Sequence, residues 1–243
     1  MTERLYKKFT LVIPTLNEAG NIETVLDRAS ATLSRMDCDW SVVVVDDCSS
    51  DGTSDVVTRY SQENSRVQLV TRRGERGLSG AITFGWKHTD AAWLGVMDAD
   101  LQHPPEVLAP LLGEMAKGAD IVIASRYLRP DSMDGWNPVR KLISQVGVLI
   151  SRLVQRREIR AKDPLSGFFI VRRECIEGIE FQKSGFKLLL EILALGRIST
   201  LKEVPSNFAV RKSGNSKANT LVGVQYVTLL SRLLFKRDRA VLK

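Results

Sequence analysis

Short apolar runs alternate with segments of helical periodicity along the first half of the chain. The apolar runs, each of strand length, lie at residues 9–14, 41–46, 67–71, 93–97 and 120–125. Between them, apolar residues recur every three or four positions and predict helices at residues 22–33, 53–60 and 78–91, with another starting at Pro104 and Pro105. Strands and helices in this order form a mostly parallel sheet covered by helices. The pattern therefore predicts a Rossmann-like α/β fold.

Acidic residues gather directly after the predicted strands. Asp46 and Asp47 follow the second strand, Asp98 and Asp100 follow the fourth, and Glu18 lies just beyond the first. In a parallel sheet these ends meet at one edge, where ligands bind. Carboxylates in one crevice repel each other unless a cation compensates them, so the pattern indicates a divalent metal ion. Asp-x-Asp pairs also occur as helix caps and solvated turns, but the position after a strand favours the metal.

The sequence lacks the motifs of several other phosphate and catalytic sites. No Gly-x-x-x-x-Gly-Lys-Ser/Thr motif occurs, and the glycines from Gly74 to Gly80 do not have the spacing of a dinucleotide fingerprint. We interpret that segment as a loop that enters a helix. With only two histidines, His88 and His103, a histidine-rich metal site and a Ser-His-Asp triad are disfavoured.

Length, charge and cysteine content indicate a single globular domain with basic appendages. The 243 residues are near the upper limit for one hydrophobic core. The net charge of +7 is uneven, because residues 126–160 carry +5 and residues 211–243 carry +7. Three cysteines without a Cys-x-x-Cys spacing predict a reduced, intracellular protein. No stretch approaches the roughly 18 apolar residues of a spanning helix, so we expect any membrane contact to be peripheral.

Both basic regions contain a predicted helix whose apolar residues share one face. In residues 139–154 these are Leu142, Val146, Leu149, Ile150 and Leu153, and in residues 221–235 they are Val222, Tyr226, Leu229, Leu230 and Leu233. Such faces most often belong to core helices. Because Lys and Arg cluster beside them, helices lying on a membrane surface, or faces that meet an accessory membrane subunit, are the alternatives.

Several motifs together resemble glycosyltransferase family 2. They are Val12-Ile13-Pro14-Thr15-Leu16-Asn17-Glu18, the segment from Val45-Asp46-Asp47 to Thr53, and Met97-Asp98-Ala99-Asp100-Leu101-Gln102 with the residues to Glu106. Four more look like the dolichol-phosphate mannose synthase branch: Ser125-Arg126-Tyr127, Arg140 to Ser144, Asp163 to Phe168, and Gly185-Phe186-Lys187. The resemblance extends over about residues 8–235 and implies a GT-A fold and an inverting, metal-dependent transferase.

The resemblance also implies roles for individual residues. It assigns Mg²⁺ or Mn²⁺ and the donor diphosphate to Asp98, Asp100 and Gln102, with Ala99 between the aspartates, and the nucleoside to Pro14, Leu16, Glu18, Asp46 and Asp47. It assigns the acceptor phosphate to Arg126, Arg140 and Ser144, while Arg211 and Lys217 would close on the donor diphosphate. The implied catalytic residues are Asp98, Asp100, Arg126, Arg140 and Arg211. Leu16 departs from many relatives, which carry an aromatic residue there.

The implied reaction transfers a sugar from a nucleotide sugar, with GDP-mannose favoured, to dolichyl or polyprenyl phosphate on the cytoplasmic side of a membrane. UDP-glucose or another UDP-sugar is the alternative donor, and a nonenzymatic membrane-surface binding module is the alternative function. We expect a catalytic domain at residues 1–210, which includes the helix at 139–154, followed by a basic loop and an amphipathic helix at 211–243. Many relatives continue into transmembrane helices beyond this point, so the protein is either a short peripheral version or dependent on an accessory membrane subunit, and the sequence leaves both alternatives open. We expect no nucleic acid as a partner.

Overall fold

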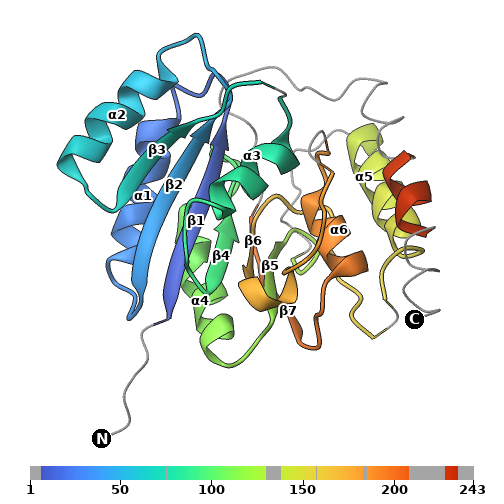
Figure 1. Ribbon diagram of the computed structural model, residues 1–243. Coiled ribbons are helices and arrows are strands. Elements are labelled where there is room, and N and C mark those ends of the chain that lie inside the picture. Colours follow the sequence, from blue (N-terminus) through green and yellow to red (C-terminus); the bar gives the residue numbers. More distant parts are fainter. Residues whose placement is uncertain are drawn as a thin grey trace, which may run out of the picture.

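A seven-stranded sheet forms the centre of the computed structural model, with strand order β3-β2-β1-β4-β6-β5-β7 (Figure 1). The structure describes residues 7–74, 76–129, 138–156, 158–182, 185–207 and 228–234, except for the side chains of residues 138–143. The strands are β1 (Lys8–Thr15), β2 (Asp39–Asp46), β3 (Val67–Thr71), β4 (Trp93–Val96), β5 (Ile121–Ser125), β6 (Phe169–Arg172) and β7 (Leu201–Pro205). The predicted α/β fold is confirmed.

Helices follow the strands in the expected alternation. They are α1 (Ile22–Leu33), α2 (Thr53–Glu63), α3 (Leu78–Trp86), α4 (Leu108–Ala116), α5 (Pro138–Ser151) and α6 (Leu188–Leu195), with two 3₁₀ turns, η1 (Pro105–Val107) and η2 (Arg173–Cys175). A further helical segment occupies residues 228–234. The helix predicted at 78–91 ends earlier, at Trp86, and the hydroxyl of Thr89 accepts a hydrogen bond from the Ala91 amide in the connection that follows.

Alternate residues of the central strands face two hydrophobic layers. Phe9, Leu11 and Ile13 of β1 pack with buried residues of α1, α2 and α4, whereas Val12 packs with buried residues of α3 and α6. This follows from the two-residue period of a strand, which sends neighbouring side chains to opposite faces. The helices therefore cover both faces of the sheet and leave the carboxyl ends of the parallel strands as a shared edge.

One strand runs against the direction of the rest. β6 pairs antiparallel with β4 on one side and with β5 on the other, while the other four pairings, which join β1 to β2, β1 to β4, β2 to β3 and β5 to β7, are parallel. Because β6 enters the sheet from the opposite end, the loop that precedes it, residues 163–168, lies at the edge where β4 and β5 terminate. This reversal brings a second loop to the ligand-binding edge.

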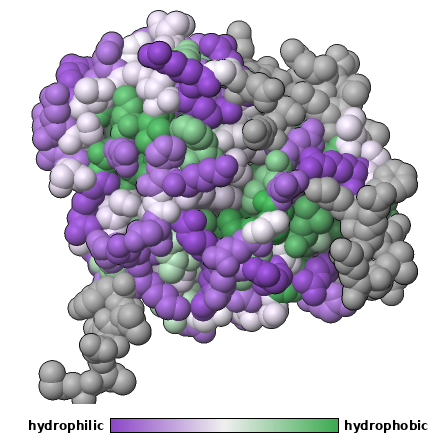
Figure 2. Space-filling model, viewed as in Figure 1, coloured by the Kyte–Doolittle hydropathy of each residue, from purple (hydrophilic) through white to green (hydrophobic). Residues whose placement is uncertain are grey.

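The two predicted amphipathic helices differ in what their apolar faces meet. On α5 the side chains of Val146, Leu149 and Ile150 are exposed, with 61% of Leu149 accessible. In the segment 228–234, by contrast, Leu229 and Leu233 are buried and pack in a cluster with residues of α6. The core interpretation therefore holds for these leucines of the second helix. On α5 these three side chains are exposed, and contact of this face with a membrane or an accessory subunit stays a prediction. Figure 2 shows hydrophobic surface over the region of α6.

Within the described ranges, the helices are too short or too polar to cross a membrane. All three cysteines carry free thiols, of which Cys48 is exposed, Cys38 is half-buried and Cys175 is buried.

Candidate active site

The loops after β1 and β2 are tied together by side-chain hydrogen bonds. The Asn17 amide donates to the hydroxyl of Ser49 at 2.8 Å, and the Asn17 side-chain carbonyl accepts from the Ser50 amide at 2.9 Å. The Glu18 amide donates to the hydroxyl of Thr53 at 2.9 Å. The predicted nucleoside segments from Pro14 to Glu18 and around Asp46 and Asp47 therefore form one wall at the carboxyl edge of the sheet.

The paired aspartates at the end of β2 are held by internal partners. Asp46 is fully buried and accepts hydrogen bonds from Thr15, from the amide and hydroxyl of Ser49, and from Ser54. Asp47 forms a two-pronged ion pair with Arg72, at 2.7 and 2.5 Å. These contacts show that the pair fixes the shape of the loop. A contact of either carboxylate with a nucleoside stays a prediction.

Among the residues that the structure describes, three other than glycine adopt left-handed backbone conformations, and they occur in three neighbouring loops. Asn17, Cys48 and Leu101 each have φ of 58°, and they follow β1, β2 and β4 respectively. Such conformations are costly for residues with a β-carbon, and in folded proteins they concentrate at functional sites. The strain thus marks the edge of the sheet to which the sequence assigned the donor.

The Asp-x-Asp motif follows β4 with its two carboxylates in different settings. Asp100 is buried and its Oδ1 accepts the Gln102 amide at 3.1 Å, whereas Asp98 is half-buried and lines a cavity. Gly167, in the loop before β6, lies directly against the Asp98 carboxylate, and a β-carbon at this position would overlap Asp98 Oδ2. Only glycine allows the two loops to approach so closely.

The donor set after β4 fits Mg²⁺ or Mn²⁺. Asp98, Asp100 and Gln102 offer hard oxygen ligands, as these ions prefer. Within the described part of the chain, no group of three or more His, Cys, Asp or Glu side chains is placed to hold a metal ion. An ion at this motif would therefore take further ligands from water and from phosphate oxygens, which is the usual arrangement for Mg²⁺ at phosphate sites.

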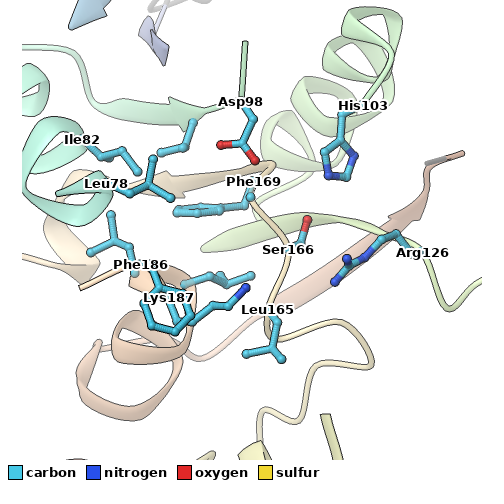
Figure 3. Close-up of a pocket in the computed structure, with 14 residues that line it drawn as sticks. Leu78, Ile82, Asp98, His103, Arg126, Leu165, Ser166, Phe169, Phe186 and Lys187 are labelled. Carbon is cyan, nitrogen blue, oxygen red and sulfur yellow. The ribbon is translucent and has the colours of Figure 1, made fainter. Parts of the chain in front are cut away.

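A cavity of about 220 Å³ lies between α3, β4, the loop before β6 and the start of α6 (Figure 3). Charged and polar groups enter it from Asp98, His103, Arg126 and Lys187. The rest of the wall is largely apolar and includes Leu78, Ile82, Leu165, Phe169 and Phe186. Two of the predicted site residues, Asp98 and Arg126, are thereby brought to one cavity from the ends of β4 and β5.

Arg126 is held rigidly by Asp163. Its Nε and Nη2 donate to the two carboxylate oxygens, both at 2.7 Å, and its backbone amide donates to Oδ2 at 3.0 Å. Although burial lowers the pKa of Arg126, its bonds to Asp163 raise it above the usual value. Asp163 is itself fixed, since the Lys162 and Asp163 amides donate to the Glu203 carboxylate on β7. The orientation of the guanidinium therefore depends on β5, which Arg126 directly follows, and on Glu203 of β7, which binds the segment of Asp163.

The other predicted acceptor residues are placed to different degrees. Ser144 on α5 shares a 2.7 Å hydrogen bond with the hydroxyl of Tyr127, so α5 is joined to the segment that follows Arg126. Arg140 lies within α5, but its side chain is outside the described residues, as are Arg211 and Lys217 altogether. The roles of these three residues stay predictions.

Two charged or titratable residues of the cavity were assigned no role from the sequence. His103 is buried, stacks edge-on against Phe168 and hydrogen-bonds to Ser206 through Nδ1, and burial together with the charge of Arg126 lowers its pKa to about 3. Lys187 precedes α6, and burial followed by the charge of Arg126 lowers its pKa to about 8. The Gly185-Phe186-Lys187 motif was the available signal for the lysine, but its spacing does not reveal which strand ends it faces.

Comparisons with known proteins agree with this geometry. The family model described as Glycosyl transferase family 2 matches residues 10–179. A dolichol-phosphate mannosyltransferase of Pyrococcus furiosus is 38% identical over 93% of this chain, and one of Saccharomyces cerevisiae is 32% identical over 93% of this chain and 86% of its own length. The chain spans 64% of the length of the Pyrococcus protein.

The solved structures that resemble this one share its fold. Glucosyl-3-phosphoglycerate synthase of Mycobacterium tuberculosis, in complex with Mn²⁺, UDP and glucosyl-3-phosphoglycerate, superimposes with a TM-score of 0.68 over 95% of this chain and 80% of that chain, at 20% identity.

Proposed function

The chain belongs to glycosyl transferase family 2, and on that basis we propose that it transfers a sugar from a nucleotide sugar to the phosphate of a dolichyl or polyprenyl lipid. The observation that carries the proposal is the cavity at the carboxyl edge of the sheet, where Asp98 of the Asp-x-Asp motif faces the cationic side chains of Arg126 and Lys187. The names of the two curated relatives supply the class of acceptor.

The reaction follows from the chemistry of the acceptor. A phosphate oxygen attacks the anomeric carbon, the bond from that carbon to the diphosphate breaks, and the nucleoside diphosphate leaves with the bonding electrons. Because the phosphate is already an anion, no strong general base is needed, in contrast to glycoside hydrolysis. The protein must instead hold two anionic groups close together and in line. This single displacement inverts the configuration at the sugar carbon.

The residues of the cavity fit this task. Arg126, oriented by Asp163, presents a planar cation of the kind that binds phosphate oxygens well. Its partner Asp163 prevents the side chain from swinging away between turnovers. The apolar wall formed by residues such as Leu78 and Phe186 limits the water that could compete with the acceptor for the sugar.

The metal ion at Asp98, Asp100 and Gln102 would stabilise the negative charge on the departing diphosphate. Mn²⁺ is present in the complex of the Mycobacterium tuberculosis enzyme, which supports a divalent ion here, and Mg²⁺ offers the same preference for oxygen ligands.

We place the reaction at a membrane surface because of α5. Leu149 on α5 and Leu153 in the turn that follows α5 are 61% and 64% exposed, and α5 also carries Ser144. Large apolar side chains that stay exposed in a folded protein mark interaction surfaces. Since Ser144 is joined to Tyr127 beside Arg126, this face would bring the lipid phosphate to the cavity while the lipid tail stays in the bilayer.

GDP-mannose is the proposed donor because the curated relatives are named as mannosyltransferases. A UDP-sugar is the second candidate, favoured by the UDP bound in the structurally similar synthase.

A transfer assay decides between these donors. Purified protein would be incubated with radiolabelled GDP-mannose, UDP-glucose or UDP-N-acetylglucosamine, a short polyprenyl phosphate, and either Mg²⁺, Mn²⁺ or EDTA. We expect labelled lipid from GDP-mannose only, and only with metal. Labelled lipid from a UDP-sugar would identify that sugar nucleotide as the donor in place of GDP-mannose. Binding of lipid vesicles without binding of any nucleotide sugar would instead favour a nonenzymatic membrane module.

A further inference from the structure

Lys187 is a charged cavity residue with no carboxylate partner among the described residues. Among the described residues, its ammonium group forms no hydrogen bond and no ion pair, whereas the guanidinium of Arg126 is bound by Asp163. Its Nζ lies over the ring of Phe186, 5.4 Å from the ring centroid. An ammonium group withdrawn from bulk water is costly unless an anion or water satisfies its three donors.

The position of Lys187 identifies where such an anion would lie. In Figure 3 its side chain extends from the start of α6 toward the space between Asp98, Ser166 and Arg126. Among the charged residues, Arg126 has the largest effect on the pKa of Lys187, which it lowers, while Asp98 raises this pKa. Two cations on the same cavity repel each other. An anion between them is attracted to both and so offsets this repulsion.

Arg126 and Lys187 are not equivalent as anion ligands. The guanidinium charge is already compensated by the two short bonds to Asp163, whereas Lys187 has no carboxylate bound to it among the described residues. The cavity also borders the first residues of α6, Leu188 and Leu189. The positive end of that helix adds to the attraction for an anion near Lys187.

We infer that Lys187 binds a phosphate oxygen of the acceptor, between the metal-binding motif at Asp98 and the guanidinium of Arg126. The inference rests on the proposed function and adds a residue to its acceptor site. The acceptor phosphate is the better match than the donor diphosphate, because Lys187 extends toward Ser166 and Arg126, the residue assigned to the acceptor, whereas the diphosphate is assigned to the motif at Asp98 (Figure 3).

Binding of farnesyl phosphate tests this independently of turnover. Titration calorimetry would compare the wild type with Lys187→Met and Lys187→Gln, in the presence of Mg²⁺ and the nucleoside diphosphate. Met keeps a long apolar side chain beside Phe186 but lacks the charge. We expect the dissociation constant for farnesyl phosphate to rise about tenfold or more, as for the loss of a charged hydrogen bond, while that for the nucleotide changes less than twofold.

Lys202→Met is the matched control, since Lys202 is exposed on β7 away from the cavity and should bind farnesyl phosphate as the wild type does. The inference is overturned if the Lys187 variants bind farnesyl phosphate as tightly as the wild type, if only nucleotide binding weakens, or if the wild type does not bind farnesyl phosphate. A wild type that binds this lipid but transfers no sugar would contradict the proposed function and leave the inference about Lys187 standing on the binding data.

Discussion

The Asp98 carboxylate rests against the α-carbon of Gly167, with no room for a β-carbon between them. The contact joins the end of β4 to the loop that precedes the antiparallel strand β6. It therefore links the predicted metal ligand to the loop that also supplies Asp163, the partner of Arg126.

Gly167→Ala should displace Asp98 and impair transfer far more than folding. The added methyl group overlaps Asp98 Oδ2, and the backbone of Gly167 is not in the left-handed region, so alanine causes no backbone strain. A shift of about 1 Å at a reacting group can lower kcat by about 100-fold. Steady-state assays and thermal unfolding would be compared with Gly113→Ala, where a β-carbon meets nothing within 4 Å. Equal activity of the two variants would contradict the role given to this contact.

Asp100→Ala should remove metal-dependent activity. Asp100 is a predicted metal ligand, and without it only Asp98 and Gln102 of the motif would remain to bind the ion. We therefore expect kcat to fall by about 100-fold or more. Mn²⁺ with nucleoside diphosphate should raise the melting temperature of the wild type but not of the variant, a readout that does not require turnover. Asp55→Ala, at an exposed position of α2, should respond as the wild type does. Full activity in EDTA would show that the reaction does not need a divalent metal ion.

Asp163→Asn should destabilise the protein, because Arg126 would be left buried without its ionic partner. Both side chains are nearly inaccessible to solvent, with 11% of Arg126 and 0% of Asp163 exposed. Breaking one side of such a pair costs about 3 kcal/mol of unfolding free energy. Urea denaturation would measure this against Asp90→Asn, which removes the partner of Lys8 from an exposed ion pair and should leave stability unchanged. Equal midpoints for the two variants would show that Asp163 does not hold Arg126.

Helices and strands in which apolar and polar residues alternate with a regular period could be predicted well from the sequence. Segments that lack such an alternation could not. The bounds of α1 and β3 follow directly from the spacing of apolar residues. Helix α6 was missed because Leu188–Leu195 is apolar nearly all round and so carries no helical period. The reversed direction of β6 was also missed, since pairing with β4 and β5 depends on contacts far apart in sequence.

The candidate site shows the same division. Asp98 could be assigned because it directly follows a recognisable strand. Lys187 and Asp163 could not be given roles, because their importance depends on which other strand ends they face after folding. The exposure of Leu149 was equally hidden, since an apolar helix face has the same sequence pattern whether it meets a core or a membrane.

Replacing Leu149 and Leu153 by Ser should weaken binding to lipid vesicles without unfolding the protein. Both side chains are already exposed, so little packing is lost. If the two leucines enter the bilayer surface, their removal should reduce the partition coefficient by about tenfold or more. Sedimentation with phosphatidylserine vesicles would compare the double variant with Lys117→Ser, an exposed position at the end of α4. Identical sedimentation would assign the apolar face to another partner, such as an accessory subunit.

His103 should make the protein less stable as the pH falls. Its pKa is about 3 in the folded state, below the ordinary value of 6.5, so between these values the unfolded chain binds a proton that the folded protein does not. Stability therefore rises with pH in this window, and His103 should account for a loss of roughly 3 kcal/mol between pH 7 and pH 4. Chemical denaturation at both pH values would show a smaller loss for His103→Gln than for the wild type. The chain contains one other histidine, and His88→Gln, at an exposed position of the α3 connection, is the matched control that should keep the full loss. If all three proteins lose stability in parallel, His103 is not the group that stays unprotonated in the folded state.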